Sequence, residues 1–172
     1  RKFDSFDRNL LKPYGIKLAA FVIDDGWQDR STVWQPRKDL YPDGFAPLAR
    51  ALEARGTRLG LWMPLSGFGL NAKLLAEKYG LEKSNAGNFF CLAGPRWRAA
   101  LSRQVENFIR TAHIAYFKHD FNFLNCSASD HGHLPSYAHG REANVDGTEA
   151  MLKFERSLNP DIFLNVTSGM WY

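Results

Sequence analysis

The segment Tyr116–Asn122 (YFKHDFN) carries the side chains best suited to chemistry. If it forms a strand, alternate side chains lie on one face, which places Lys118, Asp120 and Asn122 together. An ammonium near a carboxylate favours its ionised form, which a carboxylate nucleophile requires. The pattern indicates a nucleophile at Asp120 held by Lys118, with an ordinary buried ion pair as the alternative. The side chains expected to pack beneath helices are those of the opposite face: Phe117, His119 and Phe121.

A second group of polar and aromatic residues is Asp24-Asp25-Gly26-Trp27-Gln28. Two adjacent carboxylates can accept hydrogen bonds from neighbouring sugar hydroxyls, and Trp27 can offer a flat apolar face to the ring. The alternative is a simple turn, because Asp-Gly is a strong turn dipeptide. Trp62 is a further candidate for lining such a pocket, with a position in the core as its alternative.

Metal binding is the third chemistry to consider, because the chain contains His131-Gly132-His133 and His139. These histidines fall in a loop with Gly and Pro, and no partner ligand lies at a matching strand end except Asp120, which is paired with Lys118. The two cysteines, Cys91 and Cys126, match no metal or redox spacing and are too few for a disulfide scaffold. We therefore predict no metal and no cofactor, with a metal-dependent barrel hydrolase that uses the His-rich loop kept as an alternative.

The elements that must position these residues alternate along the chain. Apolar runs predict four buried strands, and apolar residues at helical spacing between them predict four helices. Such alternation, with crossovers long enough for parallel pairing, indicates an α/β fold. No Gly-rich phosphate loop follows an early strand, and reactive residues after several strands favour a (β/α)8 TIM barrel. The predicted strands are 18–24, 58–63, 114–120 and 161–166; the predicted helices are 45–52, 70–79, one beginning at Pro95, and 151–158.

The chain length sets a limit on this barrel. A full barrel takes about 250 residues and eight strands, whereas this chain has 172 residues and four predicted strands. We expect residues 1–172 to be a single domain, about four consecutive β/α units of a barrel truncated at both ends. Unpaired edge strands would then need the remaining barrel strands or self-association.

Composition excludes several functional classes. Apolar residues make up 45% of the chain, which excludes a disordered protein. The net charge is +4, but the basic residues are dispersed, so we predict no nucleic-acid partner. No run approaches the roughly 20 apolar residues of a membrane span, so we predict no membrane association. The cellular compartment stays open.

Four blocks of the sequence resemble the α-galactosidase (melibiase) superfamily and, within it, glycoside hydrolase family 36. They agree with it in order and spacing, and the resemblance covers roughly residues 15–170. The four blocks are Phe21–Gln28 (FVIDDGWQ), Tyr41–Phe45 (YPDGF), Gly60–Trp62 (GLW) and Tyr116–Asn122 (YFKHDFN).

The resemblance implies a retaining glycosidase that hydrolyses terminal α-linked sugars in oligosaccharides or glycosides without a cofactor. By that analogy Asp120 is the nucleophile, and Lys118 contacts sugar hydroxyls and holds Asp120 ionised. Asp24 and Asp25 would bind the hydroxyls at the far edge of the ring. The remaining residues that the resemblance assigns to the sugar pocket are Trp27, Trp62 and Asn122.

Two departures from the family pattern bear on activity. Relatives commonly carry a Glu-x-Cys-Ser-Gly-Gly-like segment where this chain has Asn165–Gly169 (NVTSG), so contacts near the sugar 2-position, including that of Ser168, are expected to differ. The general acid/base of the superfamily lies two strands beyond the nucleophile, past the end of this sequence. A retaining site needs two carboxyl groups about 5–5.5 Å apart, so we expect the isolated 172 residues to be inactive.

Two other functions fit the same residues. One is a carbohydrate-binding relative that has kept the pocket and lost the chemistry. The other is a transglycosylase of raffinose-synthase type, in which a sugar rather than water takes the glycosyl group.

Overall fold

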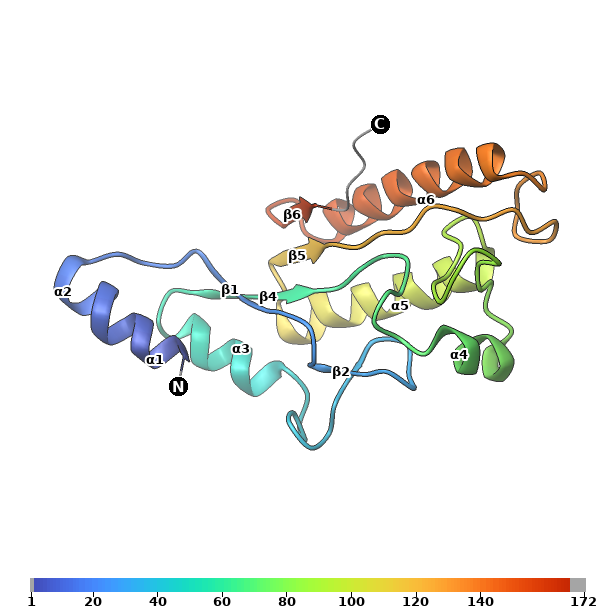
Figure 1. Cartoon of the computed structure of the whole chain (residues 1–172). Coiled ribbons are helices and arrows are strands. Elements are labelled where there is room, and N and C mark those ends of the chain that lie inside the picture. Colours follow the sequence, from blue (N-terminus) through green and yellow to red (C-terminus); the bar gives the residue numbers. More distant parts are fainter. Residues whose placement is uncertain (1, 168–172) are drawn as a thin grey trace.

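The computed structural model describes residues 2–167 and is built on one sheet of four parallel strands (Figure 1). Neighbours in the sheet follow the order in which these strands occur in the chain, as in consecutive β/α units. All four predicted strands are confirmed, each slightly shorter than predicted. They are β1 (Ala20–Ile23), β4 (Arg58–Trp62), β5 (Tyr116–His119) and β6 (Phe163–Val166).

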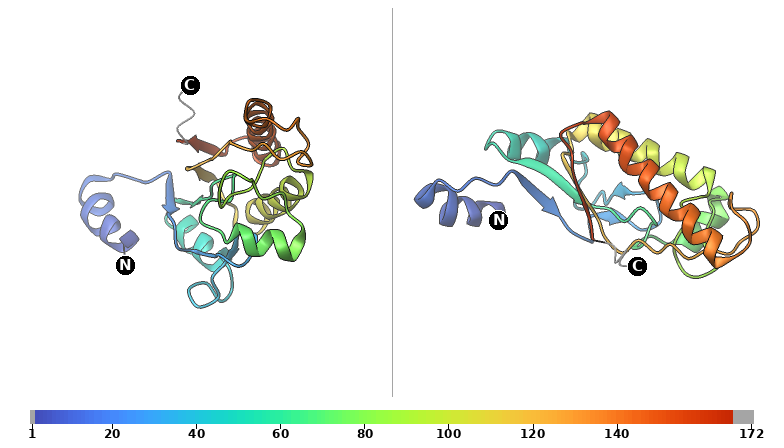
Figure 2. Two further views of the ribbon diagram at one scale, coloured as in Figure 1. Left: turned by 45° about the vertical axis from the view of Figure 1, so that its right-hand side comes forward. Right: turned by 90° about the horizontal axis from the view of Figure 1, so that it is seen from above.

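Four helices follow the strands of the main sheet within residues 2–167, and three of them cover one face of it. The long helices α5 and α6 lie side by side (Figure 2), and the apolar stripe of α5 is buried, as its spacing predicts. Asn71 caps α4 by accepting a hydrogen bond from Leu74 N, and Gly80 ends it in the left-handed conformation. The three that cover the sheet are α3 (Ala46–Glu53), α5 (Pro95–Ala112) and α6 (Tyr137–Leu158), whereas α4 (Ala72–Tyr79) lies beyond the carboxyl ends of the strands (Figure 1).

Helix α6 begins much earlier than its apolar pattern predicts. Ser136 caps it by accepting a hydrogen bond from His139 N. Its first half contains Gly140 and Gly147, which lower helix propensity but let the helix approach two backbones. A Cβ on Gly147 would lie 2.7 Å from the Leu92 carbonyl oxygen. Close packing therefore explains the presence of Gly140 and Gly147, which weaken the helical pattern of the sequence in this half of α6.

Two further features have no counterpart in the sequence prediction. A helical segment at the N-terminus projects away from the rest of the chain (Figures 1 and 2), and Phe3 within it packs edge-on against Phe21. A short antiparallel pair follows β1 and does not join the main sheet. The elements are α1 (Lys2–Phe6), the π-helix η1 (Asp7–Leu11), α2 (Lys12–Tyr14), β2 (Gln28–Asp29) and β3 (Gln35–Pro36).

The two faces of the main sheet differ in burial. Leu59, Leu61 and Phe117 point toward the helices and are at most 1% exposed. On the other face Phe163 is 58% exposed, although its ring stacks on that of Tyr116. Helices on one face and an uncovered opposite face, within residues 2–167, are typical of a barrel wall.

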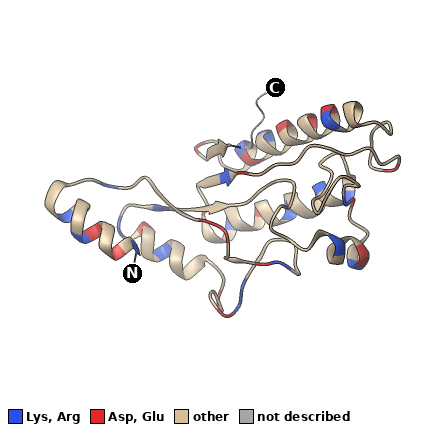
Figure 3. Cartoon of the chain, viewed as in Figure 1, with Lys and Arg blue, Asp and Glu red and all other residues tan. Residues whose placement is uncertain are grey.

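Charge on the surface is mixed. Figure 3 shows basic and acidic residues interspersed along α1 and α6. No helix within residues 2–167 has the length and apolarity needed to cross a bilayer.

Candidate active site

An ammonium and two carboxylates meet where the parallel strands end. Lys118 Nζ lies 3.0 Å from Asp24 Oδ2 and 3.6 Å from Asp120 Oδ2. Asp24 follows β1 and Lys118 is in β5, so the contact joins two strands that β4 separates in the sheet. The side chain of Asp120 is 18% exposed and that of Lys118 is 28% exposed. The side chain of Asp24 is 66% exposed, so the cluster is open to a ligand on the Asp24 side.

The two closer partners stabilise each other's charge. The hydrogen bond and charge of Asp24 raise the pKa of Lys118 despite its partial burial. Burial acts to raise the pKa of Asp24, but the Asp25 backbone N–H and the Lys118 ammonium outweigh it and lower that pKa. Both groups are therefore charged at neutral pH.

Asp120 sits where the chain leaves β5. Its Oδ1 accepts a hydrogen bond from Phe121 N at 2.9 Å. Phe121 has a φ of 50°, in the left-handed region that bulky residues rarely adopt, and its side chain is 51% exposed. The prediction that Phe121 packs beneath helices is wrong, because the strand ends at His119 and the period-2 alternation ends with it.

Asn122 is turned inward by the same change of direction. Its side chain is buried, and its Oδ1 accepts a hydrogen bond from Ser66 N at 3.2 Å. Ser66 Oγ in turn donates to the carbonyl oxygen of Phe121 at 3.2 Å. The prediction that Asn122 shares the exposed polar face is therefore corrected: it ties the loop after β5 to the loop after β4.

The opposite face of β5 holds a buried ion pair directly below this site. His119 is fully buried, with Nδ1 2.7 Å from the Met63 carbonyl oxygen and Nε2 3.0 Å from Glu155 Oε2. Burial acts to lower the pKa of His119, but the charge and hydrogen bond of Glu155 outweigh it and raise that pKa. The pair fixes the end of β5 to α6, immediately before Asp120 in the chain.

Asp25 faces a cavity beside the cluster. Its Oδ1 accepts a hydrogen bond from Gln28 Nε2 at 2.7 Å, and its Oδ2 lies 3.4 Å from Arg30. The cavity has a volume of about 660 Å³, and Phe68 and Phe123 also line it.

Three exposed phenylalanines form an aromatic surface at this cavity that the sequence analysis missed. The ring centroid of Phe68 lies 5.1 Å from that of Phe121 and 5.4 Å from that of Phe123. All three side chains are between 37% and 51% exposed. Exposed aromatic rings grouped at a cavity suit an apolar ring face. The sequence feature that could have indicated this surface is the pair Phe121 and Phe123, which follows Asp120.

Trp27 and Trp62 lie in the core and not on this surface. They are 1% and 2% exposed, and Trp27 Nε1 donates to the Trp62 carbonyl oxygen at 2.9 Å. Trp27 stacks on Trp34, and Trp62 meets Trp34 edge-on. The prediction that Trp27 offers a free ring face to a sugar is therefore wrong. Trp62 lies in the core, which was the alternative considered for it.

The last predicted site residue, Ser168, lies outside the described residues. Just before it, Asn165 on β6 donates a hydrogen bond from Nδ2 to the Tyr116 hydroxyl at 2.9 Å.

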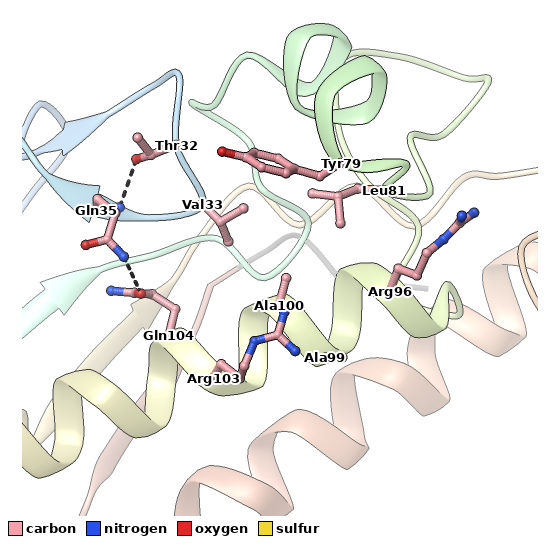
Figure 4. Close-up of a pocket in the computed structure, with 10 residues that line it drawn as sticks. All are labelled: Thr32, Val33, Gln35, Tyr79, Leu81, Arg96, Ala99, Ala100, Arg103 and Gln104. Carbon is pink, nitrogen blue, oxygen red and sulfur yellow. Dashed lines mark hydrogen bonds between the residues drawn. The ribbon is translucent and has the colours of Figure 1, made fainter.

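A second cavity lies elsewhere on the molecule. It has a volume of about 590 Å³ and is lined by the β2–β3 loop, the end of α4 and one side of α5 (Figure 4). Gln35 Nε2 donates to Gln104 Oε1 at its edge. None of the predicted site residues lines this cavity.

The proteins that resemble this chain over most of its length are solved structures. No model of a known protein family matches it, and no curated protein does. A variant of the glycoside hydrolase family 36 α-galactosidase AgaA from Geobacillus stearothermophilus, in complex with 1-deoxygalactonojirimycin, superposes with a TM-score of 0.70 at 22% identity, over 98% of this chain and 25% of that one. The chain has an α-galactosidase-like fold.

Two further structures agree. The α-galactosidase from Lactobacillus brevis gives a TM-score of 0.65 at 18% identity, over 95% of this chain and 24% of that one. TtGalA from Thermus thermophilus, in complex with p-nitrophenyl α-D-galactopyranoside, gives a TM-score of 0.63 at 22% identity. The match covers 97% of this chain and 35% of that one. The chain thus spans about a quarter to a third of the length of these proteins. The predicted fold, part of a TIM barrel, is confirmed.

Proposed function

We propose that this chain contributes the nucleophile side of the active site of a retaining α-glycosidase, with terminal α-galactosides as its substrates. The observation that carries the proposal is the position of Lys118 Nζ, 3.0 Å from Asp24 and 3.6 Å from Asp120. This contact gathers one cation and two anions from two strand ends of an α-galactosidase-like fold, where barrel enzymes place their catalytic groups.

In the proposed reaction the Asp120 carboxylate attacks the anomeric carbon. The bond to the leaving oxygen breaks as a carboxylic acid elsewhere in the site protonates that oxygen, which leaves a glycosyl ester on Asp120. The same acid, now a base, then takes a proton from the water that hydrolyses the ester. Two donors, the Lys118 ammonium and the Phe121 N–H, are directed at Asp120 and position it.

Substrate binding is assigned to charged and aromatic groups beside the nucleophile. Asp24 and Asp25 accept hydrogen bonds from sugar hydroxyls, and Lys118 donates to them. The aromatic surface of Phe68, Phe121 and Phe123 packs against the apolar face of the sugar ring. The sequence had led us to expect Trp27 in this role. Structures of AgaA variants with similar folds are complexes with raffinose and stachyose, which supports an α-linked oligosaccharide as the substrate class.

The test is Asp120→Ala in the intact protein, with Asp146→Ala on the exposed side of α6 as its matched control. We expect Asp120→Ala to lower kcat on an aryl α-galactoside by at least about 10³-fold while galactose binding is retained. The control should keep its turnover. Equal turnover in the two variants would contradict the proposal. A wild-type protein that binds galactose without any turnover would show a carbohydrate-binding protein instead.

A further inference from the structure

Two cysteines and two histidines from separate segments meet outside the carboxylate–lysine cluster. Cys91 lies just before α5, and Cys126, His131 and His133 lie in the loop between β5 and α6. Each offers one ligand atom, and these four atoms all lie within 4.8 Å of one another. Both cysteines are fully buried, and His131 is only 8% exposed. Two sulfurs and two imidazoles form one of the donor sets of structural zinc sites.

The ring nitrogens of His133 are arranged as in a metal ligand. Its Nδ1 lies 2.8 Å from the Leu134 carbonyl oxygen, so this nitrogen carries the proton and donates it. Its Nε2 is buried and has no hydrogen-bond partner within residues 2–167. A buried nitrogen with a free lone pair is uncommon in a folded protein. Ligand histidines typically donate from the second nitrogen to a carbonyl or carboxylate.

The other three ligands are also supported by their neighbours. His131 Nδ1 lies 3.3 Å from Cys126 Sγ, and His131 Nε2 lies 3.6 Å from Asp130 Oδ1. Asn144 Nδ2 donates to Cys91 Sγ at 3.1 Å. The Asn144 side chain is itself fixed, because its Oδ1 accepts from Leu92 N at 2.6 Å. An amide donor held against sulfur is suited to a thiolate, the form in which cysteine binds metal.

Glycines allow the segments that carry the ligands to approach. Gly132, between the two histidines, has a φ of +82°, and a Cβ there would lie 2.9 Å from the Ala93 carbonyl oxygen. A Cβ on Gly140 in α6 would overlap the carbonyl oxygen of Cys126. The backbone thus closes around the cluster at two points where only glycine fits.

We propose that Cys91, Cys126, His131 and His133 bind one Zn²⁺ ion and that this ion has a structural role. Thiolate and imidazole donors favour zinc over magnesium or calcium. Four protein ligands complete a tetrahedral shell and leave no position for water or substrate. This separates the site from the catalytic metal of a metal-dependent hydrolase.

The ion would fasten a long loop that has no helix or strand of its own. Residues 120–136 begin with Asp120 and end at the cap of α6. Loops of this length are rarely ordered without an additional constraint. A metal joined to Cys91 fixes the middle of this loop against the segment before α5. Cys91 lies on a different segment from its partners, so the spacing along the sequence does not indicate this set.

The experiment measures metal in the intact protein, purified without chelator, by plasma mass spectrometry. We expect about one zinc per chain. Cys126→Ser and His133→Ala should each remove most of it, while His139→Ala, an exposed histidine of the same region, should retain it. Asp120→Ala should also retain it, so loss of activity and loss of metal are separable.

A second measurement needs no variant, so it tests the proposal even if the substituted proteins do not fold. The wild-type protein, exchanged into Co²⁺, should show the visible bands of tetrahedral cobalt and a thiolate charge-transfer band in the near ultraviolet. The proposal is overturned if the wild-type protein holds no zinc and gives no such cobalt spectrum, or if mass spectrometry finds a disulfide between Cys91 and Cys126.

Discussion

Lys118 hydrogen-bonds the carboxylate of Asp24 at 3.0 Å, closer than its 3.6 Å approach to Asp120 on its own segment. The ammonium therefore links the strand that precedes the Asp-Asp pair to the strand that precedes the proposed nucleophile. A sugar hydroxyl that enters between these groups can accept from Lys118 and donate to Asp24. Under the proposed function, Lys118 thus couples sugar binding to the positioning of the nucleophile.

Removal of that charge should impair catalysis more than folding. In the intact protein we expect Lys118→Met to lower kcat/KM by about 10²- to 10³-fold, because a charged donor is lost at the site where charge develops. The measurement is steady-state hydrolysis of an aryl α-galactoside. Lys153→Met, which removes an exposed surface ion pair with Glu149, is the control and should change little. An unchanged kcat/KM in Lys118→Met would contradict the assigned role.

The aromatic surface should contribute to binding and not to chemistry. We expect Phe123→Ala to raise KM for an α-linked oligosaccharide about five- to tenfold, because one stacking face is worth about 1 kcal/mol. The value of kcat should change by less than about twofold, since ground-state and transition-state binding are weakened alike. Tyr14→Ala, at an exposed aromatic of the N-terminal helices, is the control. A large fall in kcat at unchanged KM would contradict this prediction and would indicate that Phe123 positions the loop after β5.

Trp27 should act through stability. Trp27→Phe replaces the buried indole by a smaller ring and removes the hydrogen bond to the Trp62 carbonyl oxygen, so we expect a loss of about 2–3 kcal/mol in the free energy of unfolding. Urea unfolding gives this value, and sugar titration of the folded variant should give an unchanged Kd. A weakened Kd at unchanged stability would restore Trp27 as a sugar-binding surface.

The buried His119–Glu155 pair should make stability depend on pH. The folded-state pKa of His119 lies above its ordinary value of 6.5, so its contribution is fully present below pH 6.5 and is lost as pH rises through the folded-state pKa. We expect the free energy of unfolding of the wild-type protein to fall with pH above 6.5. Glu155→Gln should weaken this slope. An equal slope in both proteins would show that the pair is not its source.

Local patterns account for most of the fold that the sequence predicts. The strands and the buried stripe of α5 follow from apolar periodicity, because burial of these apolar side chains stabilises the folded state. The first half of α6 does not, because Gly140 and Gly147 serve close packing against other segments. Period-2 alternation also fails at Phe121, where a positive φ ends the strand without a sequence signal.

The candidate site divides in the same way. Asp24 and Asp120 directly follow parallel strands and Lys118 lies near the end of one, so their proximity is predictable from the strand ends. The burial of Trp27 is not, because its ring packs on Trp34, a residue from the irregular segment after β2. The Cys91 contact with the His-rich loop likewise depends on how two connecting segments pack.

Mass spectrometry of the trapped glycosyl-enzyme tests the central claim most directly. The intact protein is incubated with a fluorinated α-galactoside that forms the ester but hydrolyses it slowly, and is then digested for peptide mapping. The predicted result is one added glycosyl group, located on Asp120. A glycosyl group on any other residue, or an unlabelled protein that still hydrolyses the ordinary galactoside, would contradict the account.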